Sequence, residues 1–93
     1  MDAKQALDAA KTASAQRRVR VSRHGREQME CRCASWADVL EAMFTATSAI
    51  YDPGDPPREK WRFEGGRDVD GDGLVLVVEF TDGEARVVTV FGP

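Results

Sequence analysis

The chain has 93 residues, of which 42% are hydrophobic and 31% charged, and its formal net charge is −3. These values are typical of one soluble globular domain, residues 1–93, and no stretch approaches the roughly 18 apolar residues that a membrane span needs. An acidic chain is also unlike a protein whose main task is to bind nucleic acid, because phosphate contacts favour a basic surface.

Charge is unevenly distributed along the chain. Residues 1–36 hold eight Lys/Arg against four Asp/Glu, whereas residues 37–93 hold five against twelve. A basic end on an acidic body suits docking to a basic protein at least as well as docking to RNA.

The N-terminal sequence MDAKQALDAAK carries charges at helical intervals and has no apolar signal core, so we expect no secretion signal. Cys31 and Cys33 would point in different directions on a helix, so they could not easily form a disulfide or share a metal. We therefore expect reduced thiols and a cytoplasmic location.

The first third of the chain predicts a helix, a strand and a second helix. Residues 3–15 have a helical pattern with one face of small residues, which should anchor the helix weakly. This face consists of Ala3, Leu7, Ala10 and Ser14. Residues 18–22 alternate charged and apolar side chains, so Val19 and Val21 should face the core. A short helix should then cover residues 24–32.

Ser35 is expected to cap the next helix, with Asp38 at its third position near the positive end of the helix dipole. Apolar residues at the spacing of one helix face predict a stripe in the core. This stripe consists of Trp36, Val39, Leu40, Met43 and Phe44. Ile50 and Tyr51 end this half, and DPGDPPREK, residues 52–60, is a series of turns that can join neither a helix nor a central strand.

The second half of the chain predicts strands. These are KWRFEG (60–65), LVLVVEF (74–80) and ARVVTVF (85–91), with a loop at 66–73. The Asp82-Gly83 pair between two apolar runs favours a hairpin. This order of elements predicts an α+β fold, in which N-terminal helices pack on a four- to five-stranded antiparallel sheet.

The middle and the end of the chain resemble a known family. The matching residues are His24, Met29, Arg32, Ser35, Asp38, Val39 and the run Val87-Val88-Thr89-Val90. They fit the pattern of the bacterial "domain of unknown function 4258" family over about residues 18–91. That family is similar to RelE-like and barnase/EndoU-type ribonuclease toxins. The resemblance implies a toxin-like α+β domain of that fold at residues 17–93, preceded by an extra helix at 1–16, in a bacterial toxin system.

Three departures from the family pattern bear on catalysis. Gln28 stands where the motif has its first arginine, although Arg26 lies nearby. The family's Gly-Ile is Cys33-Ala34 here. RelE-like enzymes often place catalytic groups near the C-terminus, and this sequence stops at Gly92-Pro93, directly after its last predicted strand.

His24, Arg26 and Arg32 are the candidate catalytic residues if the protein is a ribonuclease. His24 could then take a proton from a ribose 2′-hydroxyl while the arginines stabilise the phosphate. The alternative is that His24 starts the helix and hydrogen-bonds locally, with Arg32 paired to an acid such as Asp38. Catalysis would need a second acid–base group, and the candidates are Tyr51, Glu27 and Glu30.

Arg17, Arg18, Arg20 and Arg23 form a basic run over the first predicted strand. Such a run could face phosphate, form the rim of a protein interface, or simply be a solvated strand face that blunts a sheet edge.

Residues 68–79 match the calcium-loop pattern, with Asp68, Asp70 and Asp72 at positions 1, 3 and 5 and Glu79 at position 12. A valine-rich strand follows instead of a helix, and an extended segment would carry Glu79 roughly 20 Å from the aspartates. The three aspartates are therefore only a weak metal candidate, and an acidic turn between two strands is favoured.

The loops carry a group of carboxylates that could contact a partner: Asp52, Asp55, Glu59, Asp68, Asp70 and Asp72. An acidic loop surface suits capture of a basic nuclease, or it only keeps the loops soluble. Our preferred hypothesis is a non-catalytic, immunity- or antitoxin-like binding protein that neutralises such a nuclease. The alternative is a metal-independent endoribonuclease toxin that binds RNA. We expect no cofactor and no membrane contact, and open sheet edges would allow a homodimer.

Overall fold

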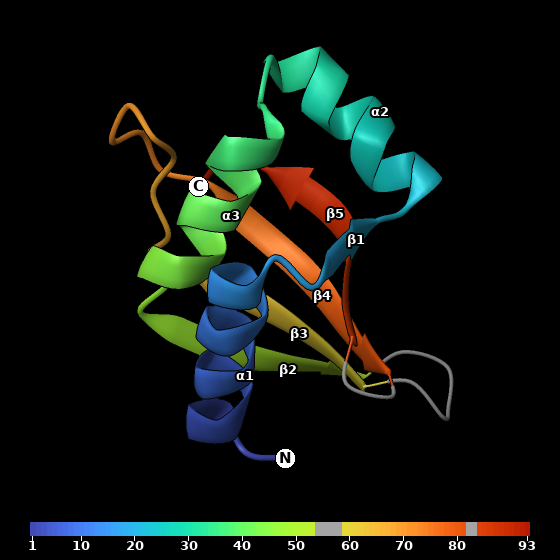
Figure 1. The fold of residues 1–93 in the computed structure, drawn as a ribbon, viewed down its shortest axis with the longest axis vertical. Helices are drawn as coiled ribbons and strands as arrows, with labels where there is room; N and C mark the ends of the chain where they lie inside the picture. Colours follow the sequence, from blue (N-terminus) through green and yellow to red (C-terminus); the bar gives the residue numbers. More distant parts are fainter. Residues whose placement is uncertain (54–58, 82–83) are drawn as a thin grey trace.

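The computed structural model describes residues 1–53, 59–81 and 84–93 (Figure 1). Its elements in chain order are α1 (Ala3–Gln16), β1 (Val19–Val21), α2 (Arg23–Arg32), α3 (Trp36–Thr45), β2 (Ser48–Pro53), β3 (Glu59–Glu64), β4 (Val75–Thr81) and β5 (Glu84–Phe91). The strands form one five-stranded sheet in the order β1-β5-β4-β3-β2. The predicted α+β fold is therefore confirmed.

The sheet is mixed, whereas we expected only antiparallel pairs. β2, β3, β4 and β5 pair antiparallel, but β1 runs parallel to β5, with Val19 beside Ala85 and Val21 beside Val87. Alternation of apolar and charged residues identifies a strand without showing its direction, which is why the sequence could not predict this pair.

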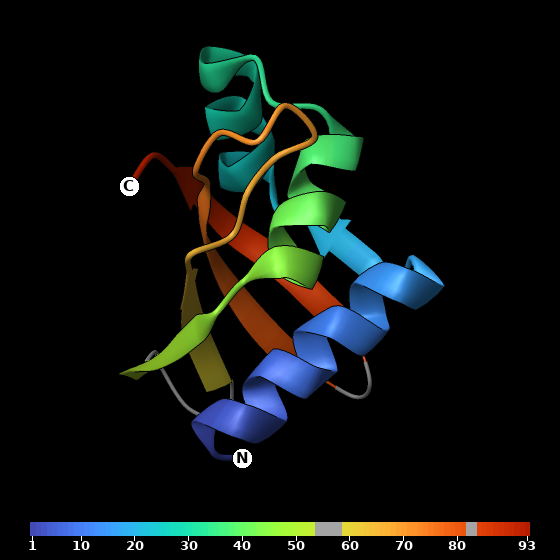
Figure 2. The same cartoon turned by 90° about the vertical axis from the view of Figure 1, so that its left-hand side faces the viewer.

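The core lies between α1, α3 and one face of the sheet (Figure 2). Its largest fully buried side chains are Phe63, Met43, Leu76, Val39, Val78, Val87 and Val90. Ala6 and Ala10 of α1 are fully buried, so the small face brings α1 close to α3. The buried face of α1 differs partly from the expected one, because Ala3 is exposed while Ala6 and Ala13 are buried.

The predicted start of α3 is confirmed by a capping box. The Ser35 hydroxyl accepts the Asp38 N–H at 3.1 Å, and the Asp38 carboxylate accepts the Ser35 N–H at 2.8 Å. The predicted core stripe is partly wrong, since Trp36 and Phe44 are 40% and 52% exposed. The buried line is narrower than the apolar stripe, because α1 and the sheet cover only part of the surface of this ten-residue helix. This line consists of Val39, Ala42, Met43 and Ala46.

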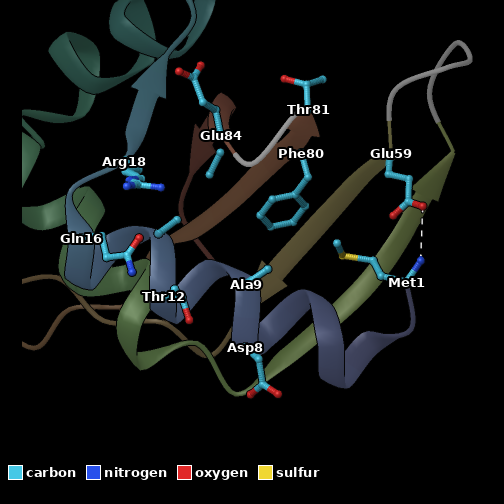
Figure 3. A pocket seen from close by; sticks show the side chains of 12 residues that line it. Met1, Asp8, Ala9, Thr12, Gln16, Arg18, Glu59, Phe80, Thr81 and Glu84 are labelled. Atoms are coloured by element: carbon cyan, nitrogen blue, oxygen red, sulfur yellow. Dashed lines mark hydrogen bonds and ion pairs between the residues drawn. The ribbon is translucent and has the colours of Figure 1, made fainter.

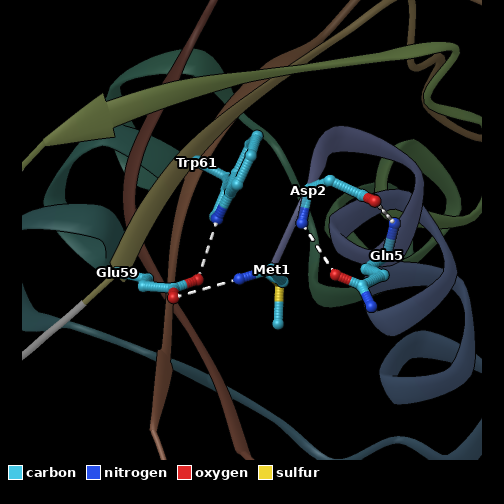
Figure 4. A network of polar contacts seen from close by, with 5 residues as sticks. All are labelled: Met1, Asp2, Gln5, Glu59 and Trp61. Atoms are coloured by element: carbon cyan, nitrogen blue, oxygen red, sulfur yellow. Dashed lines mark hydrogen bonds and ion pairs between the residues drawn. The ribbon is translucent and has the colours of Figure 1, made fainter.

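The start of α1 is tied to β3 through Glu59 (Figure 4). Asp2 and Gln5 form a second capping box, with both hydrogen bonds at 2.8 Å. One Glu59 oxygen lies 3.3 Å from the N-terminal ammonium of Met1, and the other accepts the indole N–H of the buried Trp61 at 3.3 Å. Glu59 thus links the first helix to the sheet.

Two predicted turns fall partly outside the described residues. The Asp82-Gly83 pair lies there, but Thr81 and Glu84 on either side of it are paired in an antiparallel ladder. Residues 54–58 of the DPGDPPREK segment also lie outside, while its ends belong to β2 and β3. Among the described residues, none of the helices is long and apolar enough to cross a membrane.

Candidate functional site

α2 lies against the edge of β5, beyond the point where β1 ends. The Ser22 N–H donates to the Val87 carbonyl at 2.8 Å, and the Ser22 hydroxyl caps α2 by accepting the Gly25 N–H at 3.0 Å. A Cβ at Gly25 would lie only 2.9 Å from both a Val21 methyl carbon and the Val87 carbonyl oxygen. Glycine at this position therefore lets the helix approach the sheet closely.

Gln28, at the arginine position of the motif, has a structural contact. Its side-chain oxygen accepts the Val90 N–H at 2.6 Å, just after an irregularity in the β4–β5 pairing. An arginine side chain has no acceptor atom and could not make this bond. The sequence shows the departure from the motif. Only the fold shows that the Gln28 side chain accepts a backbone N–H group at the edge of β5.

His24, Arg26 and Arg32 are not brought together around one point. His24 is exposed and makes no hydrogen bond or ion pair among the described residues. The guanidinium of Arg32 lies against Gly92, where a Cβ would collide with it. Arg32 is also roughly 12 Å from His24 along the axis of α2, since they are eight residues apart. Arg26 instead lines a groove beside β1.

Two of the three candidate acid–base partners of His24 are engaged or distant. Glu27 forms an ion pair with Arg23 at 3.4 Å on the exposed side of α2. Tyr51 is on β2, at the other edge of the sheet, with its ring centroid 5.2 Å from that of Trp61. The third candidate, Glu30, is exposed on α2.

The arginines of the predicted basic run do not form one surface in the structure. Arg17 caps α1 with a left-handed backbone (φ 56°), and Arg20 pairs with Glu84 at 3.2 Å. The groove of about 650 Å³ beside β1 is lined by arginines from three elements: Arg20, Arg26 and Arg86, together with the exposed Trp36. Sequence reasoning did not connect Trp36 with these arginines.

A second cavity, of about 560 Å³, lies between α1 and the ends of the strands (Figure 3). Phe80 points into it, with Ala9 on the opposite wall, and Arg18 and Glu59 lie at its two ends. Sequence reasoning missed this cavity because its walls come from segments far apart in the chain.

The face of the sheet opposite α1 and α3 carries a row of charged side chains, one from each strand. Their charges alternate in sign except for the last two, which are both positive. Asp52, Lys60, Glu79, Arg86 and Arg20 are neighbours in the register of the five strands. Glu79 is only 5% exposed and pairs with Arg86 at 3.4 Å. The calcium-loop pattern placed Glu79 at its last position. In the structure, Glu79 belongs instead to this row of charged side chains on the sheet.

The predicted acidic surface is divided into two groups. Asp52 and Glu59 lie at one end of β3, while Asp68, Asp70 and Asp72 follow its other end. A six-residue strand separates them by about 20 Å. Asp55 lies outside the described residues.

The loop of residues 67–73 (the acidic loop) is closed by its own hydrogen bonds. One Asp68 carboxylate oxygen accepts the N–H groups of Asp70 and Asp72, both at 2.9 Å. The Arg67 guanidinium donates to the Gly71 carbonyl at 2.8 Å, and Arg67 and Gly73 form an isolated bridge. The predicted acidic turn therefore has a defined shape.

The acidic loop is also anchored to α3. The Val69 N–H donates to Asp38 at 3.1 Å, and the Arg67 N–H donates to the Thr45 hydroxyl at 2.8 Å. The N–H groups of Ser35 and Val69 stabilise the Asp38 carboxylate, so the pKa of Asp38 is lower than its ordinary value. The carboxylates of Asp70 and Asp72 have no hydrogen bond or ion pair among the described residues.

The geometry does not assemble a metal site around the weak candidate residues. In residues 1–53, 59–81 and 84–93, no group of three His, Cys, Asp or Glu side chains could hold a metal ion. One of the two Asp68 carboxylate oxygens already accepts two N–H donors. Cys31 and Cys33 are both exposed free thiols.

Comparison with known proteins identifies one relationship. The model of the family described as "Domain of unknown function (DUF4258)" matches residues 21–92, which include every element except α1 and the first part of β1. No curated protein and no solved structure matches the chain.

Proposed function

The chain belongs to the DUF4258 family, and from that premise we propose that it is a non-catalytic binding protein of a bacterial toxin system. In this proposal it is immunity- or antitoxin-like and neutralises a basic nuclease. The likeness of the family pattern to RelE-like and barnase/EndoU-type toxins supports the kind of system. The acidic loop supports binding to a basic protein surface.

The observation that carries the proposal is the rigid presentation of Asp70 and Asp72. Hydrogen bonds within the loop and to α3 hold the acidic loop in place, while the carboxylates of Asp70 and Asp72 have no hydrogen bond or ion pair among the described residues. Val69 directly precedes Asp70 in the sequence and is 59% exposed. A pre-formed loop loses less conformational entropy on binding than a flexible one.

This chemistry fits a basic protein surface. Aspartates pair with lysine or arginine, and charge complementarity accelerates association and selects among partners. Val69 adds a small apolar contact beside them. The affinity should therefore fall as salt increases, because the exposed charges become screened.

The α2 geometry favours binding over catalysis. Among the described residues, the His24 side chain forms no hydrogen bond or ion pair with either candidate arginine, and the Gln28 side chain accepts the Val90 N–H of β5. The basic groove beside β1 is the observation that favours the alternative, an endoribonuclease toxin, because its arginines could contact phosphate.

A co-expression experiment tests the proposal. The protein encoded by the adjacent gene is expressed alone and together with this chain, and growth and total RNA are followed. We expect growth arrest with the neighbour alone and growth with both. The double variant Asp70→Asn/Asp72→Asn should weaken the rescue, while the matched variant Asp8→Asn/Glu30→Gln, which removes two exposed acids elsewhere, should not.

Expression of this chain alone separates the two candidates. Normal growth with intact RNA is expected for the binding protein. Growth arrest with degraded RNA that His24→Ala abolishes would overturn the proposal and establish the ribonuclease alternative.

A further inference from the structure

The two edges of the sheet differ in how they are protected. At one edge, β1 is only three residues long and carries the charged Arg20, and α2 covers the continuing part of β5 through the Gln28 hydrogen bond to Val90. Charged side chains and covering helices are common means of keeping a sheet edge from pairing with another molecule.

Within the described part of the chain, the other edge, β2, has no covering helix along its outer side, and its charged residue and its proline, Asp52 and Pro53, lie only at its end. It pairs with β3 on one side only and is the last strand of the sheet order. In Figure 2, its ribbon runs across the front of the molecule without an element outside it. Ile50 and Tyr51 are 40% and 52% exposed, and no charged residue occurs between Ser48 and Tyr51.

We propose that β2 pairs antiparallel with β2 of a second copy, about a two-fold axis at Ile50, to form a continuous ten-stranded sheet. In this register Ile50 meets the partner's Ile50. Ser48 lies opposite the partner's Asp52, and Ala49 lies opposite the partner's Tyr51. Antiparallel edge pairing of this kind is isologous, so both copies contribute the same surface.

The side chains of β2 are self-complementary in this register. Ile50 and Asp52 share the open face of the sheet, because they pair with Arg62 and Lys60 of β3. A serine hydroxyl opposite a carboxylate can donate a hydrogen bond to it. Ala49 and Tyr51 share the helix-covered face, where a small residue opposite an aromatic ring gives a close fit.

Registers shifted towards the C-terminal end of β2 are less favourable. A shift that places Tyr51 opposite the partner's Tyr51 also places Asp52 opposite the partner's Ile50, which brings a charge onto an apolar side chain. A further shift places Asp52 opposite the partner's Asp52, and like charges directly opposite destabilise a strand pair. Pro53 has no N–H group and ends the pairing.

Light scattering coupled to size-exclusion chromatography tests the dimer over a wide range of concentrations. We expect the molar mass of the intact protein to approach twice that of one chain as concentration increases. Ile50→Lys and Ile50→Glu should each remain monomeric, because two like charges would meet at the axis. Glu30→Lys, which adds a positive charge at an exposed position on α2, should still dimerise.

Mixing the two charged variants tests the register itself. An equimolar mixture of Ile50→Lys and Ile50→Glu should regain the doubled mass, because lysine would then face glutamate at the axis. Circular dichroism establishes that each variant is folded. A monomeric intact protein at every concentration, or dimers of both charged variants alone, would overturn the proposal. Neither result bears on the nuclease-binding test, which depends on the acidic loop.

Discussion

Asp38 holds Val69 by a hydrogen bond of 3.1 Å between residues that are 31 positions apart. The same carboxylate accepts the Ser35 N–H through its other oxygen. One side chain therefore begins α3 and fixes the acidic loop, so the stability of the helix and the shape of the candidate binding loop depend on each other.

Asp38→Asn should destabilise the protein and loosen the acidic loop. An asparagine has one acceptor oxygen, so it can serve only one of the two N–H groups, and its amide nitrogen would face a donor. We expect the free energy of unfolding in urea to fall by about 1–2 kcal/mol. Hydrogen exchange of the Val69 amide should accelerate. Asp70→Asn, an exposed change in the same loop, should leave both quantities nearly unchanged.

The stabilising effect of Asp38 should depend on pH. Its pKa is lowered in the folded protein, so its contribution is complete above the ordinary value of 3.8 and is lost as the pH falls through the lower folded value. The difference in unfolding free energy between the intact protein and Asp38→Asn should therefore be largest at neutral pH and should shrink in acid. A difference that grew in acid would contradict the assignment.

Gln28→Arg restores the arginine of the family motif but should destabilise this protein. It removes the acceptor of the Val90 N–H, and an unsatisfied buried donor costs about 1–3 kcal/mol. Gln28→Glu keeps an acceptor and should lose less stability. Thermal unfolding of both variants measures the difference. We also expect no ribonuclease activity from Gln28→Arg, since His24 and Arg32 would still lie roughly 12 Å apart along the axis of α2.

Gly25→Ala should lower stability although alanine is the better helix former. An added Cβ would meet Val21 and the Val87 carbonyl at 2.9 Å, so α2 would have to move away from β5. We expect a loss of about 1–3 kcal/mol from overpacking, against a gain of up to about 1 kcal/mol from helix propensity. Glu30→Ala, on the exposed side of the same helix, should be nearly neutral. A Gly25→Ala variant more stable than the intact protein would show that the contact is loose.

Calcium should not stabilise the acidic loop. One Asp68 oxygen already accepts two N–H groups, and among the described residues no three His, Cys, Asp or Glu side chains are placed to hold a cation together. We therefore expect the same Tm in calcium chloride and in a chelator. A clear rise in Tm with calcium, lost in Asp68→Asn, would reverse this prediction.

Much of the fold could be predicted because it depends on local patterns. The Ser35 cap of α3 and the β4 and β5 strands have strong local signals and are confirmed. β2 was missed, because SAIYDP has few residues of strong strand preference and ends in a proline. Trp36 was assigned to the core because periodicity identifies a helix face without showing how much of it the neighbours cover.

The candidate site depended more on contacts between distant residues. The sequence identified the aspartates of the acidic loop and predicted an acidic turn. It could not show that Asp38 and Thr45 of α3 anchor that turn, because those contacts join residues more than twenty positions apart. The role of Gln28 was hidden for the same reason, since its partner is 62 residues away.

The parallel pairing of β1 with β5 also has a consequence for how the protein is made. β5 is the last strand to be synthesised, yet it lies inside the sheet, between β1 and β4. While residues 84–91 are still within the ribosome, β1 has no strand to join and α2 has no edge to cover. The sheet therefore cannot grow steadily from the N-terminus during translation, and its final order is reached only after the last strand has emerged.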